Sequence, residues 1–197
     1  MSISETTYQT LRTELLNNEQ EVILRLEQKY MDFLFDVVKQ NADNIYQDFH
    51  KAIDLKDFWI NYAPRQRGRQ PKNESIPWGE VGEKTMIARM ARGIAETYPP
   101  ITYPGLPVGS DLRIALDDAL IHFDVKLTGP NDNPNEIVAS PYQISGDGPI
   151  WDNGVKNNTF QVTGDRRRMQ FYPQLPPFYV LESRVMVCLT YFLKAVY

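Results

Sequence analysis

The chain has 197 residues, of which 42% are hydrophobic and 12% aromatic, and its formal net charge is −4. This size and composition are typical of one globular domain, in which we expect residues 1–57 to be a helical part and residues 58–197 a catalytic core. One cysteine and two histidines exclude an intramolecular disulfide and a multi-cysteine zinc site. A bound metal is therefore expected to be a hard, oxygen-liganded ion such as Mg²⁺.

Acidic charge is concentrated near the N-terminus, because residues 1–57 hold 11 acidic and 6 basic side chains. A nucleic-acid partner thus remains compatible with the negative total. The N-terminus lacks the basic and apolar regions of a secretion signal. The apolar residues 185–197 are fewer than the roughly 20 needed to cross a bilayer, so we expect a buried strand there and no membrane association.

The first 50 residues are expected to be helical. Residues 5–53 contain no Gly or Pro and carry apolar residues at helical spacing, which predicts two or three helices; examples are Val22, Leu26, Tyr30, Phe33 and Val37.

The next segment, residues 63–77, is rich in proline and predicts an exposed loop. It holds a basic cluster that could contact phosphates or could simply be solvated charge; its members are Arg65, Arg67, Arg69 and Lys72.

Residues 79–98 predict a helix that ends before Pro99. Its buried face carries Ile87, Met90 and Ile94. Glu83 lies within about 40° of the same direction at 100° per residue, so a carboxylate is directed inward. Glu80 points close to that direction too, and periodicity does not choose between the two acids.

Residues 111–127 predict a hairpin that turns near Asp117 and Asp118. Its second strand, residues 119–126, alternates apolar residues at odd positions with Leu120, His122, Asp124 and Lys126 at even positions. Further strands are expected at residues 136–140, 159–163, 169–172, 178–181 and 185–193. Helices followed by such strands predict an α/β or α+β fold, a mixed sheet flanked by helices.

Asp111 together with Asp124 and Lys126 suggests a metal-dependent phosphodiesterase. Two carboxylates can bring a divalent cation onto a phosphate oxygen, and the amine can orient the attacking water and offset developing charge. The carbonyl of Val125 is a natural additional ligand. The alternative is an ion pair on a solvated strand face, because this short pattern is common by chance.

Neighbouring residues have simpler readings. The position of Glu83 is equally explained by the dipole of a helix N-terminus, a turn explains Asp117 and Asp118, and His122 is better explained as a hydrogen-bonded core residue than as a base. A second basic cluster, Arg166, Arg167 and Arg168, is either a phosphate contact or solvated charge. No phosphate-binding loop, dinucleotide-binding, serine-hydrolase or zinc-protease motif occurs.

Several longer blocks carry a family resemblance. The run "FWINYAPRQRGRQPKNESIPWGEVGEK" at residues 58–84, with "GLPVGSD", "FDVKLTGPND", "SPYQISGDG" and "VKNN", resembles the BglI-type type II restriction endonucleases of the PD-(D/E)xK nuclease superfamily. The likeness covers about residues 50–180 in collinear order.

The resemblance implies a homodimeric, Mg²⁺-dependent bacterial enzyme, cytoplasmic, that cuts both strands of an interrupted G·C-rich palindrome in foreign DNA. It implies that Asp111 and Asp124 bind metal, that Lys126 is the catalytic lysine, and that Glu83 is a helix-borne acid. It places Asp132 near the bases.

Two departures accompany the resemblance. Ser110 stands where the pattern usually has Pro, and family members continue beyond the equivalent of Tyr197, in a part that carries much of their base readout. The alternative function is therefore a non-catalytic or specificity-altered DNA-binding or dimerisation module of the same fold.

Overall fold

A computed structural model describes residues 4–18, 20–54, 76–98, 102–105, 109–128, 131, 133, 137, 139–146, 175–181 and 184–196. Helices α1 (Glu5–Asn18), α2 (Gln20–Asp54) and α4 (Ile76–Thr97) precede strands β1 (Leu112–Ala115) and β2 (Ala119–Thr128). A short 3₁₀ helix, η3 (Pro141–Gln143), and strands β3 (Phe178–Leu181) and β4 (Arg184–Val196) follow.

The described strands form one mixed sheet in the order β1-β2-β4-β3. β1 and β2 are the predicted antiparallel hairpin, in which Leu112 pairs with Phe123 and Ala115 with Leu120. β4 lies parallel to β2 with Lys126 opposite Lys194, and β3 is antiparallel to β4. The mixed sheet flanked by helices confirms the predicted fold class.

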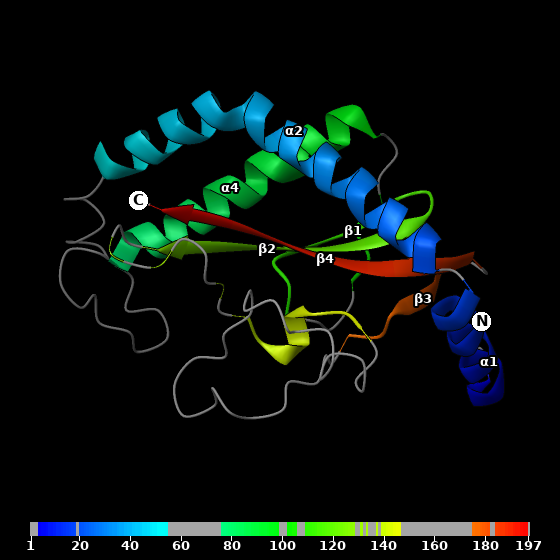
Figure 1. Ribbon diagram of the computed structural model, residues 1–197. Helices are drawn as coiled ribbons and strands as arrows, with labels where there is room; N and C mark the ends of the chain where they lie inside the picture. Colours follow the sequence, from blue (N-terminus) through cyan, green and yellow to red (C-terminus); the bar gives the residue numbers. More distant parts are fainter. Residues whose placement is uncertain are drawn as a thin grey trace.

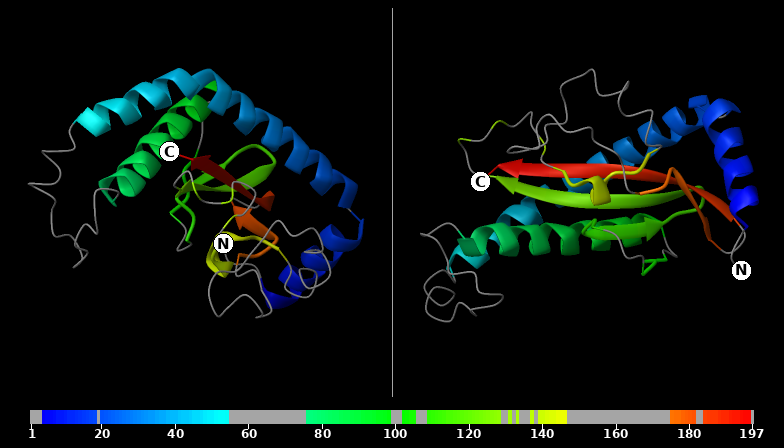
Figure 2. Two further views of the ribbon diagram at one scale, coloured as in Figure 1. Left: turned by 60° about the vertical axis from the view of Figure 1, so that its left-hand side comes forward. Right: turned by 90° about the horizontal axis from the view of Figure 1, so that it is seen from below.

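Helices α2 and α4 cover one face of the sheet (Figure 1). The core between them is apolar: Tyr30, Met90 and Ile94 of the helices are buried together with Ile121 and Phe123 of β2. Figure 2 shows the same layering from two other directions, with η3 on the opposite face. That second face is buried as well, since Leu120, His122 and Asp124 are at most 1% exposed.

Two glycines allow the helices to approach closely. A Cβ at Gly93 would lie 2.8 Å from Val37 Cγ1 of α2, and one at Gly82 would lie 2.6 Å from Phe49 Cε2. The crossing of α2 and α4 therefore depends on the absence of side chains at these two positions.

Two ion pairs and a tyrosine hydrogen bond connect α2 to its neighbours. Arg89 of α4 lies 2.5 Å from Asp48 Oδ2, and the guanidinium lowers the pKa of Asp48. Lys29 Nζ lies 2.8 Å from Asp118 Oδ2, and the Tyr30 hydroxyl donates a hydrogen bond to the same carboxylate. Asp118 thus ties the β1–β2 turn to α2.

Three details differ from the sequence-based expectations. α4 begins at Ile76, so the end of the loop expected at 63–77 is helical and Pro77 lies in the first turn, where a missing N–H costs nothing. Val22 is 41% exposed although its spacing predicted burial. Of the strand expected at 136–140, Ile137 forms a β-bridge and Ala139 and Ser140 lie in no strand, whereas residues 136 and 138 lie outside the described residues. The strands expected at 159–163 and 169–172 lie outside the described residues.

No described helix is long and apolar enough to span a membrane. The apolar residues near the C-terminus form β4, as predicted, with Leu189 and Tyr191 buried against the helices.

Candidate active site

The site begins where β1 ends its pairing with β2. β1 pairs only with Leu120–Phe123, while β2 continues to Thr128. From Asp124 onward, no described strand lies on that side of β2. Asp111 stands in the vacant position, and its Oδ2 accepts a hydrogen bond from the Val125 N–H at 2.9 Å.

This contact brings Asp111 beside the Asp124–Lys126 segment, as the spacing predicted. The N–H and C=O of one strand residue point to the same side of the strand. The Val125 carbonyl therefore points toward the side on which Asp111 lies. Asp111, Asp124 and this carbonyl provide three oxygen groups around one point at the end of the hairpin.

Asp124 is the most deeply buried member, at 1% exposure. Its Oδ1 forms an ion pair with Lys126 Nζ, and its Oδ2 accepts a hydrogen bond from Gln143 Nε2. Burial raises the pKa of Asp124, which Lys126 opposes and Asp111 reinforces. A buried carboxylate with a second carboxylate nearby favours binding of a cation.

Glu83 of α4 is the acid that faces this pair. Burial raises the pKa of Glu83, and the carboxylates of Asp111 and Asp124 raise it further, while Lys126 opposes them. Glu83 is half-buried on α4 and interacts electrostatically with both carboxylates, in line with the inward direction that its periodicity predicted. Nothing is described of the Glu80 side chain, the alternative acid.

The oxygen groups suit a hard divalent cation. Asp124 Oδ1 is buried and has no hydrogen bond of regular geometry among the described groups, only the ion pair with Lys126. In the described ranges, no group of three or more His, Cys, Asp or Glu side chains is placed to hold a metal ion. Mg²⁺ does not need such a group, because it binds through one or two carboxylates and keeps several waters.

His122 belongs to the core and not to this cluster. It is fully buried, its Nδ1 lies 3.0 Å from Ser110 Oγ, and burial lowers its pKa to about 4, helped by the charge of Arg113. A neutral, hydrogen-bonded histidine is what the simpler interpretation predicted. Ser110, which replaces the usual proline, is its partner.

Sequence reasoning missed one contact of the site, that of Gln143 with Asp124, and one of the neighbouring core, that of Ser110 with His122. Gln143 lies 19 residues from Asp124 in the chain, and no periodicity links a loop glutamine to a strand. The expected DNA contacts cannot be placed, because Arg65, Arg67, Arg69, Lys72, Asp132, Arg166, Arg167 and Arg168 lie outside the described residues.

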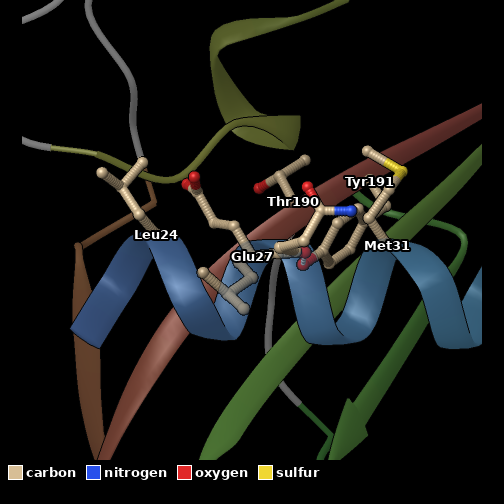
Figure 3. A pocket seen from close by; sticks show the side chains of 7 residues that line it. Leu24, Glu27, Met31, Thr190 and Tyr191 are labelled. Carbon is tan, nitrogen blue, oxygen red and sulfur yellow. Dashed lines mark hydrogen bonds between the residues drawn. The ribbon is translucent and has the colours of Figure 1, made fainter. Parts of the chain in front are cut away.

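A pocket of about 350 Å³ lies elsewhere, between α2 and β4 (Figure 3). Leu24, Glu27 and Met31 line it from the helix, and Thr190 and Tyr191 from the strand. Its lining includes none of Asp111, Asp124, Glu83 and Lys126, the carboxylate cluster with its lysine. The candidate site lies instead on β2, beyond the end of its pairing with β1.

Comparisons with known proteins point to one family. The sequence model of a family described as "Restriction endonuclease BglI" matches residues 4–197. The type II restriction enzyme BglI of Bacillus subtilis is 31% identical over 202 residues, which cover 93% of this chain and 67% of the relative. The crystal structure of the restriction endonuclease BglI bound to its DNA recognition sequence superposes with a TM-score of 0.74 at 30% identity, covering 98% of this chain and 70% of that one.

Proposed function

Because the chain belongs to the BglI restriction endonuclease family, we propose that it is a Mg²⁺-dependent endonuclease whose cleavage site is built from Asp111, Asp124 and Lys126. Membership makes the chain a site-specific deoxyribonuclease that acts on double-stranded DNA. The observation that carries the residue assignment is the hydrogen bond from the Val125 N–H to Asp111, which brings both carboxylates to one end of the hairpin.

Asp111, Asp124 and the Val125 carbonyl would hold the cation. When bound, Mg²⁺ supplies positive charge to a non-bridging phosphate oxygen and lowers the pKa of a coordinated water. Asp124 stays ionised there because Lys126 and the cation offset its burial.

Lys126 is the only described ammonium that pairs with a carboxylate of the cluster, and it is 25% exposed. Such a side chain can reach from Asp124 toward a phosphodiester lying over the end of the hairpin. There it orients the nucleophilic water and offsets charge on the phosphorus oxygens. Glu83, which α4 holds on the helix side of the sheet, would be a further acid that orients water near the cation.

The target we propose is an interrupted G·C-rich palindrome, cut by a homodimer in the bacterial cytoplasm as part of host defence. Two-fold symmetry supports this, because a dimer on a palindrome presents one active site to each strand. Light scattering of the purified chain with and without a cognate duplex tests the dimer. A monomer in both conditions would contradict it.

Cleavage is tested by incubating the purified chain with Mg²⁺ and plasmid DNA. Discrete fragments are expected, and Asp124→Asn and Lys126→Ala should abolish them while DNA retardation in gels persists. Lys194→Ala is the matched control, because Lys194 is opposite Lys126 on β4 and donates to the Asn133 carbonyl. If Lys126→Ala cuts as well as Lys194→Ala, the residue assignment is wrong.

A further inference from the structure

The loop that contains η3 places one neutral side chain on the cluster. Gln143 Nε2 donates to Asp124 Oδ2, and its Oε1 accepts a hydrogen bond from the Ser140 N–H at 2.8 Å. The Gln143 N–H in turn donates to the Ser140 carbonyl at 2.9 Å. Because its oxygen is engaged by a backbone donor, the amide has one orientation, with the NH₂ group directed at Asp124.

The same loop also holds the segment that carries Asp111. Gln143 Nε2 lies 3.4 Å from the Gly109 carbonyl, and the Gly109 N–H donates to the Tyr142 carbonyl at 3.2 Å. A Cβ on Gly109 would lie 3.3 Å from that carbonyl oxygen. Gln143 therefore touches Asp124 directly and the backbone two residues before Asp111, so it connects the segments of both carboxylates.

We propose that Gln143 is a positioning residue of the cation site, which reserves Asp124 Oδ2 for the protein and leaves Oδ1 for the cation. The inference rests on the proposed function. Lys126 can leave Oδ1 without freeing the carboxylate to rotate, since the amide still holds Oδ2. The neutrality of the amide matters, because a second cationic side chain would compete with the metal for the charge of the pair.

The test is Mn²⁺ binding to the full chain. Binding is measured by electron paramagnetic resonance, which requires no turnover. Gln143→Met keeps the unbranched length but removes the donor. Loss of a group that orients a metal ligand typically weakens affinity roughly 10- to 100-fold, and we expect a loss in that range. The Mg²⁺ concentration for half-maximal cleavage should rise by a similar factor, while the rate at saturating Mg²⁺ changes less.

Gln143→Lys separates positioning from simple hydrogen bonding. It retains a donor for Asp124 but adds a positive charge, so it tests the neutrality of the amide, and our proposal predicts weaker Mn²⁺ binding even though a hydrogen bond persists. The matched control is Gln28→Met, because Gln28 Nε2 donates to Asp32 Oδ1 at 2.8 Å on the exposed side of α2. It should bind Mn²⁺ like the parent.

The proposal is overturned if Gln143→Met and Gln143→Lys bind Mn²⁺ as tightly as the parent while Asp124→Asn does not. If the parent itself neither binds Mn²⁺ nor cuts DNA, the proposed function fails and the role of Gln143 fails with it. Thermal melts in EDTA confirm folding. Should Gln143→Met lack a cooperative melt, Gln143→Leu, which also removes the donor without adding charge, decides the question.

Discussion

Asp111 Oδ2 accepts a hydrogen bond from the Val125 N–H at 2.9 Å, so one carboxylate oxygen completes the edge of β2. Under the proposed function the other oxygen would bind the cation, which would give the two oxygens separate structural and chemical roles. Substitutions that remove one role or both can be told apart.

Asp111→Asn retains an oxygen that can accept from Val125, whereas Asp111→Ala does not. Both variants should lose cleavage because the negative charge is gone. Only the alanine variant should lose stability, by about 1 kcal/mol, the usual contribution of one hydrogen bond. Chemical denaturation in EDTA measures the difference, and equal free energies of unfolding would show that the Val125 contact does not support the fold.

Asp124→Asn should raise stability while it abolishes activity. The buried carboxylate is unfavourable without a cation, as the raised pKa indicates, and an amide of the same shape can still accept from Gln143. In EDTA we expect the Asp124→Asn variant to have a higher melting temperature than the parent. Addition of Mg²⁺ should raise the melting temperature of the parent to that of the variant. A variant that melts well below the parent in EDTA would mean that the Lys126 ion pair outweighs burial.

Gly93→Ala should destabilise the crossing of α2 and α4. The added Cβ would lie 2.8 Å from Val37 Cγ1 and from Asn41 Nδ2, and overpacking of this kind costs about 1–3 kcal/mol. Gly105→Ala is the control, since nothing lies within 4 Å of its Cβ position. Urea unfolding compares the two, and similar midpoints would contradict the steric account.

Cys188 should react slowly in the native chain. Burial raises the pKa of its thiol from 9.0 to about 12, so at pH 8.5 the folded thiol carries on the order of a thousandth of the thiolate of an exposed one, because only the thiolate reacts. The folded state favours the neutral thiol. The contribution of this thiol to the free energy of unfolding is therefore complete below pH 9 and is lost as the pH rises toward 12.

Iodoacetamide labelling followed by mass spectrometry checks this between pH 7 and 9.5. Labelling in 8 M urea, where the thiol is exposed, should be faster by about the same factor. Native labelling at the rate of the urea sample would show that Cys188 is accessible.

The sequence predicted the parts of the site that follow from local periodicity. Alternation in β2 put Asp124 and Lys126 on one face, and the helical stripe of Met90 and Ile94 directed Glu83 inward, because both patterns depend only on residues close in the chain. The start of α4 was placed three residues late, since Pro77 suggests a loop but is also tolerated in a first helical turn.

Contacts between distant segments could not be predicted in the same way. Gln143 meets Asp124 only because the loop of η3 lies under the sheet, and Ser110 meets His122 across the hairpin. At 136–140 the apolar residues suggested a strand, whereas Ile137 forms a β-bridge and Ala139 and Ser140 lie in no strand. The length of a strand depends on the neighbours available to it in the sheet, which the sequence does not specify.

β1 has four residues and β2 has ten. The shortness of β1 is itself part of the site, because an ordinary hairpin of matched strands would saturate the Val125 peptide with a neighbouring backbone and push Asp111 outward. Insertions that lengthen β1 by two residues should therefore abolish cleavage even when every acidic side chain is retained. Strand length, and not side-chain chemistry alone, limits how this sequence can vary.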